Sequence, residues 1–404
     1  MELDVWGRLT NLSFMVFLFI MFGLPSAAFT YVKYFSLVCL MFVLAMYIAW
    51  KREKILVSSK ILVALFLILV SVTFTLLVSA LRGHVSIDAF YELRSFLIIV
   101  LEIGITSILF TNKIVRWHKV ARVFVLSLIF FGCLKLLTLL ILFRFPNTGE
   151  IVSDLLFPDA FRGGYILFRG FYRMVAVNDY YLPVAYIITG LTSFSPKEEI
   201  AHKIVILFFV FLTFSRFLWI EMIFCIMVDF FSKSNSIKFL QVGLVVAIFL
   251  LFVGLLGQIS GADVAGTLNL RFGAEGALSI SEKANQGKAL MMEFYRFPVI
   301  GKGLGTYVES YLPPYAKVTG YLNYSYEIFI LLLLMQFGLF GFLLLGLGIF
   351  WPILVSKNGL KKKAIAFFGV SFFLSAGLTN PVILNATTGL LLSLWYMFCE
   401  QGEL

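Results

Sequence analysis

The sequence predicts an all-helical integral membrane protein, and three observations lead to this fold class. Of the 404 residues, 61% are hydrophobic and only 13% are charged, which excludes an ordinary soluble domain. Apolar runs of about 18 to 22 residues recur along the chain, and each is long enough to cross about 30 Å of hydrocarbon. Lysine and arginine gather between the runs, at 51–54, 113–122 and 361–363, as expected for cytoplasmic loops. The net charge of +10 therefore reflects membrane orientation, and no nucleic-acid partner is expected.

We predict about twelve membrane-crossing helices in a single polytopic domain, 1–404, with both termini in the cytoplasm. The first apolar run lacks a small-residue cleavage site, so it is expected to remain as a helix. Two outer loops stand out, 144–175 and 258–323, and the second is long enough to form helices of its own. The predicted crossings are 10–30, 34–50, 60–81, 95–111, 120–143, 176–194, 203–214, 216–231, 238–257, 338–356, 364–379 and 383–399.

The apolar run 204–231 is interrupted at 213–216 and allows two topologies. One continuous helix would place the second outer loop in the cytoplasm and the lysines 361–363 outside. Two short crossings keep these lysines inside, so we prefer two. The first crossing then has about 12 residues, or about 18 Å of helix, which places Arg216 below the membrane surface and facing a cavity. An arginine at that depth is costly and indicates function.

The second outer loop and the residues after it contain several local patterns. The stretch 281–297 is rich in helix-forming residues, and Pro298 ends the predicted helix. Three alternate glycines in 301–305 indicate a tight backbone turn rather than a phosphate loop. The run 326–337 is apolar but too short to cross, so we expect a helix in or on the outer leaflet. Gly338 would mark the turn into the next crossing.

Cationic side chains on the predicted outer side are candidates for binding phosphate groups, because a guanidinium is a permanently charged fork that binds phosphate oxygens in pairs. The alternative is that these side chains extend to lipid headgroups or solvent. For Arg162 and Arg271 this alternative and a functional role are equally well supported. For Arg216, between two apolar runs, function is favoured. The cations are Arg162, Arg169, Arg173, Arg216, Arg271, Lys288 and Lys302.

Glu327 is the candidate for acid–base chemistry, because it precedes an apolar run where partial loss of water would raise its pKa and suit it to act as a base. From the residues alone, a structural glutamate at a helix start is equally supported. The nearby tyrosines, including Tyr324 and Tyr326, could stack on sugars, although an interfacial aromatic belt is more common. The four cysteines and three histidines have no metal-ligand spacing, so neither a metal nor another cofactor is expected.

Six pieces of the sequence occur in a characteristic order: Arg169 with Asn178, then 213–216, 284–288, 297–305, 324–327 and 336–341. This order resembles the O-antigen polymerase and O-antigen ligase superfamily of bacterial membrane glycosyltransferases, over roughly the last half of the chain. The resemblance implies a C-type glycosyltransferase-like fold with a helical outer loop. It also implies metal-independent transfer of sugar chains from undecaprenyl pyrophosphate at the outer face of the inner membrane. Arg216, Arg271 and Arg169 would then bind the pyrophosphate.

Ligases of this superfamily carry a histidine eleven residues before the first glycine of a Gly-Leu-x-Gly turn, and in this chain that position is Glu327. We therefore predict a polymerase of lipid-linked repeat units, with Glu327 and Arg216 as catalytic residues. The alternatives are a ligase that transfers polymer to lipid A-core and a lipid-linked oligosaccharide transporter or flippase. The resemblance also implies a chain-length-regulating partner. The predicted substrate-binding residues are Arg169, Arg173, Arg271, Lys288, Lys302, Tyr324 and Tyr326.

Overall fold

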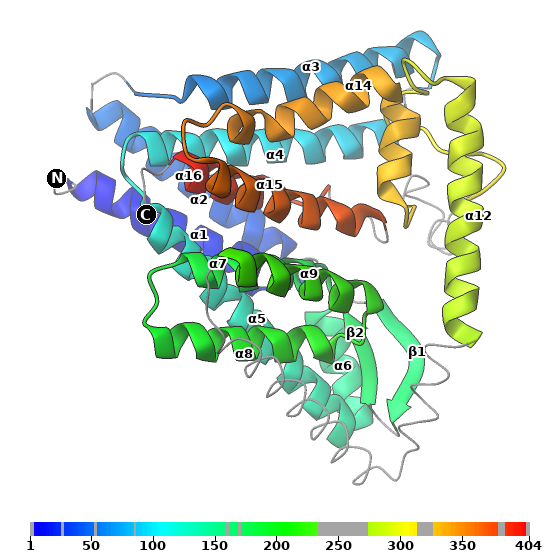
Figure 1. Ribbon diagram of the computed structural model, residues 1–404, viewed down its shortest axis with the longest axis horizontal. Helices are drawn as coiled ribbons and strands as arrows, with labels where there is room; N and C mark the ends of the chain where they lie inside the picture. The colour runs from blue at the N-terminus through cyan, green and yellow to red at the C-terminus, as the bar shows by residue number, and fades with distance from the viewer. Residues whose placement is uncertain are drawn as a thin grey trace. The chain divides into compact units, whose positions relative to one another are not determined.

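The structure, a computed structural model, is helical apart from one hairpin in the part of the chain that it describes (Figure 1). The described residues are 4–25, 28–51, 55–84, 86–158, 161–168, 171–232, 274–312, 326–378 and 384–400. Among them, six helices are long and apolar enough to cross a membrane, which indicates a multi-pass membrane protein. These six are α1 (Val5–Gly23), α2 (Thr30–Lys51), α3 (Ser59–Leu81), α4 (Ile87–Thr111), α5 (Trp117–Arg144) and α14 (Phe329–Leu354).

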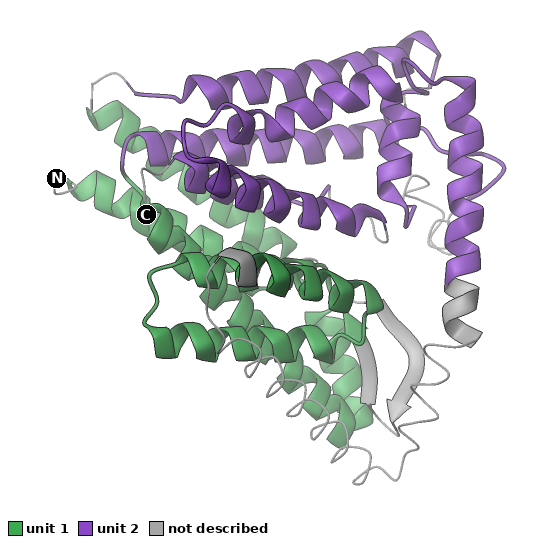
Figure 2. Ribbon diagram, viewed as in Figure 1, with its two compact units in different colours: residues 1–53, 114–276 green, residues 54–113, 277–404 purple. Residues whose placement is uncertain are grey.

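The chain forms two compact units, and each combines segments that are distant in sequence (Figure 2). Unit 1 comprises residues 1–53 and 114–276, and unit 2 comprises residues 54–113 and 277–404.

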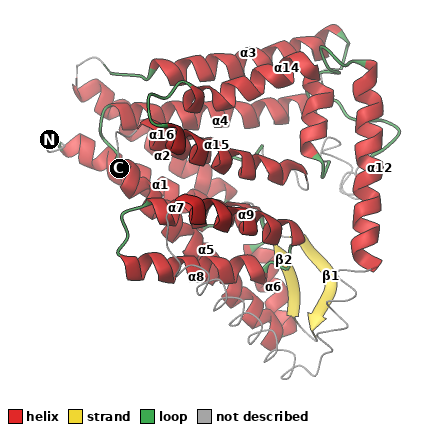
Figure 3. Cartoon of the chain, viewed as in Figure 1, coloured by secondary structure: helices red, strands yellow, loops and turns green. Residues whose placement is uncertain are grey.

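In unit 1, α1 packs against α2 and α5, and the rings of Phe22 and Phe124 meet edge to face at 4.7 Å. A two-stranded antiparallel hairpin follows α5 and α6 (Pro146–Leu156), and a sequence of short helices follows the hairpin (Figure 3). The Ser195 hydroxyl accepts the Glu198 amide at the start of α8 (Pro196–Leu212), and the Glu198 carboxylate accepts the Ser195 amide. This reciprocal capping explains why the helix begins at this point. The remaining elements of unit 1 are α6 (Pro146–Leu156), β1 (Phe161–Phe168), β2 (Phe171–Val175), η1 (Val177–Tyr181), α7 (Leu182–Leu191), α8 (Pro196–Leu212) and α9 (Arg216–Ser232).

Two buried ion pairs connect elements of unit 1. Lys135 of α5 lies 2.6 Å from Asp179 of η1, and both side chains are fully buried. Lys203 of α8 lies 2.7 Å from Asp229 of α9 and also pairs with Glu199. Because a buried charge is stable only when paired and hydrogen-bonded, each pair fixes the helices that carry it.

Unit 2 is built around α3, which packs along α14, and α4, which packs against α16 (Thr388–Glu400). Ser71 of α3 donates to the carbonyl of Gly341 at 2.7 Å. Gly338 interrupts α14 with φ 62° and ψ −180°, so two helical segments meet at an angle there. Unit 2 also contains most of α12 (Ala274–Arg296), α15 (Leu360–Ser375), η2 (Ala376–Leu378) and α16 (Thr388–Glu400).

Three local predictions are confirmed. The run 204–231 is divided between α8 and α9, with the break at 213–215. The helix predicted over 281–297 is α12, which ends at Arg296, just before Pro298. Gly338 marks the turn within 326–356, as predicted.

Six of the twelve predicted crossings coincide with the six long apolar helices. Five others correspond to shorter helices, namely η1 with α7, then α8, α9, α15 with η2, and α16. The crossing predicted over 238–257 lies outside the described residues. The structure therefore supports several crossings, and the number twelve stays a prediction.

Candidate functional site

The candidate site surrounds Glu327 in unit 2. The Glu327 side chain is 41% exposed, and its Oε2 lies 3.3 Å from Nζ of Lys283 on α12. Its backbone amide donates to Oε1 of the buried Gln286, one helical turn along α12, at 3.0 Å. The backbone of Glu327 is thus held by the buried amide side chain of Gln286, while its carboxylate remains accessible to solvent.

Tyr326, next to Glu327, is fully buried, and its hydroxyl forms hydrogen bonds with the backbone. The hydroxyl accepts the amide of Val308 at 2.9 Å and donates to the carbonyl of Tyr311 at 2.9 Å. Burial raises the pKa of Tyr326 to about 12, so the phenol stays protonated at neutral pH. Tyr326 therefore positions the backbone beside Glu327, and its ring presents no open face for stacking on a sugar.

Tyr311 extends this hydrogen-bonded cluster to α12. Its hydroxyl donates to the carboxylate of Glu282. Burial and the bond to Glu282 both raise the pKa of Tyr311 above its ordinary value. Glu282, Lys283 and Gln286 thus contribute one polar face of α12 to the site.

The segment 297–308 forms the tight turn predicted from its alternate glycines. Gly301, Gly303 and Gly305 have φ of 73°, 112° and 74°, which L side chains rarely adopt. A Cβ on Gly303 would lie 2.3 Å from Oγ of Ser79, so the turn also needs glycine for space.

Within this turn, the backbone amides of residues 301–305 are all hydrogen-bonded within unit 2. Lys302 and Gly303 donate to the carbonyls of Met335 and Gln336, at 2.8 and 2.9 Å. The amide of Gly305 donates to Oε2 of Glu92 on α4 at 2.7 Å. The amides of Gly301 and Leu304 are bonded to the carbonyls of Phe297 and Thr75. The glycine-rich part of the turn is consequently a structural connection between helices, and the amides of residues 301–305 are not available as a cradle for a phosphate.

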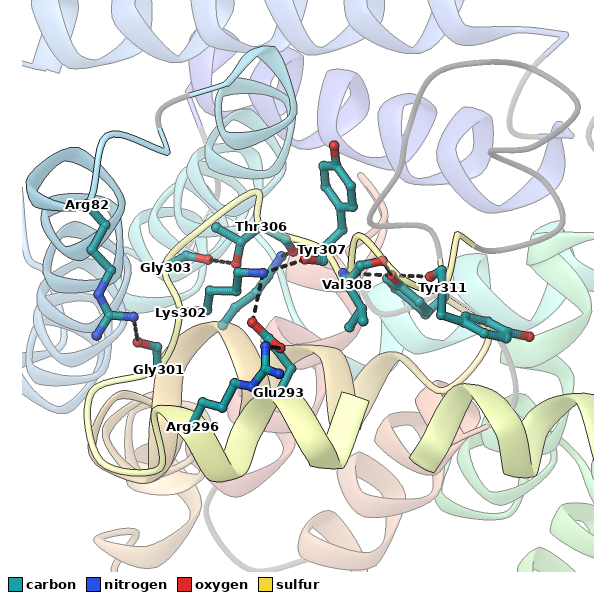
Figure 4. A network of polar contacts seen from close by, with 12 residues as sticks. Arg82, Glu293, Arg296, Gly301, Lys302, Gly303, Thr306, Tyr307, Val308 and Tyr311 are labelled. Carbon is teal, nitrogen blue, oxygen red and sulfur yellow. Dashed lines mark hydrogen bonds and ion pairs between the residues drawn. The ribbon is translucent and has the colours of Figure 1, made fainter. Parts of the chain in front are cut away.

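Lys302 belongs to the same structural network (Figure 4). Its Nζ lies 2.9 Å from Oε1 of Glu293 and donates to the carbonyl of Tyr307 at 2.9 Å. Glu293 also pairs with Arg296 at 2.9 Å. Arg82, which directly follows α3, donates to the carbonyl of Gly301 at 2.8 Å. With a side chain only 11% exposed, Lys302 fastens the turn to α12.

Arg216 is the first residue of α9 in unit 1 and is half-buried. It follows Phe214, which adopts φ 49° and packs in a core cluster with Phe131 and Met174. A non-glycine residue in this conformation is uncommon and is retained here by burial. The turn that presents Arg216 is therefore fixed by the core of unit 1.

The other predicted cations and tyrosines are distributed as follows. Lys288 is exposed on α12, and Arg173 lies on strand β2, opposite the strand that carries Arg162. Arg169, Arg271 and Tyr324 lie outside the described residues. The structure thus places Glu327 and Tyr326 in one cluster, and it describes Arg216 separately, as part of unit 1.

Sequence reasoning missed several buried carboxylates. Glu92 and Glu102 lie buried on α4, and Glu221 and Asp229 lie buried on α9. The pattern that could have identified them is an acid inside an apolar run, which is costly unless it has a purpose. Among the described residues, no group of three or more His, Cys, Asp and Glu side chains is arranged to hold a metal ion.

Unit 2 also contains an apolar cavity of about 180 Å³. Its lining includes Ile330 and Leu333 from the first turns of α14, together with Phe96 and Ile99 of α4. Helix α14, which begins two residues after Glu327, therefore borders a space suited to hydrocarbon.

A comparison with models of known protein families and a comparison with curated proteins both found no match.

Proposed function

We propose that the protein is a surface-polysaccharide polymerase. It joins oligosaccharide repeat units carried on undecaprenyl pyrophosphate, at the outer face of the bacterial inner membrane. The proposal includes about twelve crossings, cytoplasmic termini and a C-type glycosyltransferase-like architecture. A chain-length-regulating protein is its proposed partner.

The observation that carries the proposal is the setting of Glu327. Its carboxylate is accessible, while hydrogen bonds to Gln286 and around Tyr326 fix the backbone on which it stands. A general base needs this combination of a defined position and access to the proton that it removes. Lys283 orients the carboxylate. Because this ion pair is partly exposed, a substrate can displace Lys283 from the carboxylate.

In the proposed reaction, Glu327 accepts the proton of a hydroxyl on the acceptor's terminal sugar. The hydroxyl oxygen forms a bond to the anomeric carbon of the donor chain. The bond from that carbon to the pyrophosphate oxygen breaks, and undecaprenyl pyrophosphate leaves. In-line displacement of this kind inverts the anomeric centre.

The proposal assigns stabilisation of the departing pyrophosphate to arginine, above all to Arg216, with Arg169, Arg173, Arg271 and Lys288 as further contacts. Charge stabilisation by preorganised donors is commonly the largest contribution in such a step. The apolar cavity bordered by Ile330 and Leu333 supports a substrate with a hydrocarbon chain.

Complementation of a deletion strain tests the proposal. The deletion should leave lipid A-core capped with single repeat units, and the wild-type gene should restore a polymer ladder. Glu327→Gln should fail to restore the ladder at normal protein level. Glu309→Gln, the same change at an exposed acid of unit 2, should restore it.

Three results would contradict the polymerase proposal. A full ladder from Glu327→Gln would remove Glu327 from the chemistry. A deletion that leaves the core without any repeat unit would identify a ligase. Accumulation of lipid-linked units on the cytoplasmic side would identify a transporter.

A further inference from the structure

A groove in unit 1 lies between α1 and α5 near the start of both helices; we call it the α1–α5 groove. It has a volume of about 470 Å³. Asn11 of α1 lines it and donates to the carbonyl of Ile114 at 2.8 Å, so the two helix starts are tied together. Further along, Phe22 contacts Phe124, so the two helices run in the same direction from this end.

The side chains of the groove are ordered along this direction. Its cations are Arg8, Lys119 and Arg122, in the first two turns of the helices. Its apolar side chains follow them along each helix: Leu12, Met15, Val123 and Leu126. At 1.5 Å per residue, the step from Arg8 to Met15 is about 10 Å. A cationic mouth is thus continuous with an apolar floor on two helices that are apolar enough to cross a membrane.

The charges at the mouth favour an anion. Arg122 pairs with Glu198 at 3.2 Å, but both side chains are about half exposed, so the pair is weak and solvent-accessible. Asp4 is engaged as the cap of α1, where its carboxylate accepts the amide of Gly7 at 2.6 Å. Lys119 is exposed. Among the described residues, the three cations of the mouth thus stand beside the acids Glu198 and Asp4.

We propose that the α1–α5 groove binds one anionic phospholipid of the surrounding bilayer. The phosphate lies against Arg8, Lys119 and Arg122, and one acyl chain lies along the apolar floor. Charge complementarity selects the anionic headgroup, and the floor selects a lipid over a soluble anion. The cations at the mouth match the phosphate, and the apolar side chains further along the two helices match the acyl chain.

Native mass spectrometry of the full-length protein in detergent tests this site. The protein is mixed with equal amounts of phosphatidylglycerol and phosphatidylcholine, and retained lipid is counted. Wild type should retain one phosphatidylglycerol at least ten-fold more often than phosphatidylcholine. The double variant Lys119→Glu/Arg122→Glu should lose this preference.

Matched controls separate a site from general surface charge. Arg116→Glu changes an exposed cation beside the groove and should retain the lipid. Met15→Trp fills the floor and should reduce retention without a change of charge. Leu9→Trp, at a 42% exposed position of the same helix outside the groove, should not.

Each contrary outcome overturns the proposal. Equal loss in Arg116→Glu would show a general charge effect. Undiminished lipid retention in Met15→Trp would show that the floor holds no acyl chain. This test remains valid even if the double variant misfolds. Displacement of the lipid by millimolar inorganic phosphate would show a simple anion site.

Discussion

The carboxylate of Glu92 accepts the backbone amide of Gly305 at 2.7 Å across 213 residues of sequence. The other oxygen of Glu92 accepts Nε2 of Gln336 at 3.2 Å, and the Glu92 side chain is fully buried. One acid on α4 thereby holds the glycine turn and the first segment of α14 together. This junction precedes the bend at Gly338 and supports the backbone on which the candidate site is built.

Replacing Glu92 should destabilise the protein. Glu92→Ala leaves the Gly305 amide and Gln336 without this acceptor, and each buried unsatisfied group costs about 1 to 3 kcal/mol. We expect a lower midpoint of thermal unfolding for the detergent-solubilised protein. Glu309→Ala, at an exposed acid of the same unit, is the control and should unfold like wild type. Equal midpoints for both variants would show that the junction contributes nothing.

The glycine turn should not accept a side chain. Gly303→Ala places a Cβ about 2.3 Å from Oγ of Ser79 and also forces alanine to φ 112°. Together these effects should cost about 2 kcal/mol or more in the free energy of unfolding. Gly359→Ala is the matched control, because nothing lies within 4 Å of its added Cβ. Normal folding of Gly303→Ala would mean that the turn can move away from α3.

The length and hydropathy of the apolar runs were sufficient to predict the long membrane-crossing helices. The runs that became α1, α2, α3, α5 and α14 are apolar over about the thickness of a bilayer, so hydropathy alone locates them. The break before Arg216 was predictable as well, because Thr213 and Ser215 interrupt the apolar run. Such features depend on residues that are close together in the sequence.

Features that depend on distant partners were not predictable. The predicted helix 95–111 begins eight residues earlier in the structure, at Ile87, and these added residues include Asp88 and Glu92, which are buried within unit 2. Glu92 gains its partners from Gly305 and Gln336, which no local pattern reveals. The hairpin β1–β2 was likewise hidden in a segment treated as a loop.

The candidate site shows the same division. Glu327 was identified from its place before an apolar run. Its neighbours Lys283 and Gln286 come from a helix about forty residues earlier, so their contact with Glu327 needed the fold. Lys302 was expected to bind substrate from its charge, and only the structure shows its pairing with Glu293.

The ion pair of Lys135 and Asp179 should behave as a unit. Either Lys135→Met or Asp179→Asn alone leaves a buried charge without its partner, which costs about 3 to 5 kcal/mol in comparable pairs. The double variant should recover part of this loss, because no unpaired charge of the pair remains. Thermal unfolding of all four proteins gives the coupling energy. Additive losses in the double variant would contradict a direct interaction at 2.6 Å.

The stability of the protein at high pH should depend on the ionisation of the Tyr326 hydroxyl. Its pKa is raised from 10.0 to about 12 in the folded protein, so the folded state binds this proton more tightly than the unfolded state does. The resulting stability is fully present below pH 10 and is lost as the pH rises through about 12. Tyr326→Phe lacks these hydrogen bonds and should be less stable than wild type by about 1 kcal/mol at pH 8.

The difference between wild type and Tyr326→Phe in unfolding midpoint should therefore shrink between pH 10 and about 12. Other tyrosines ionise in both proteins, so the difference isolates Tyr326. Tyr295→Phe, at a 69% exposed position on α12, should show no difference from wild type at any pH. If the difference in unfolding midpoint between wild type and Tyr326→Phe stayed constant to pH 12, the protonated phenol would not hold Val308 and Tyr311. The backbone beside Glu327 would then be fixed by Gln286 alone.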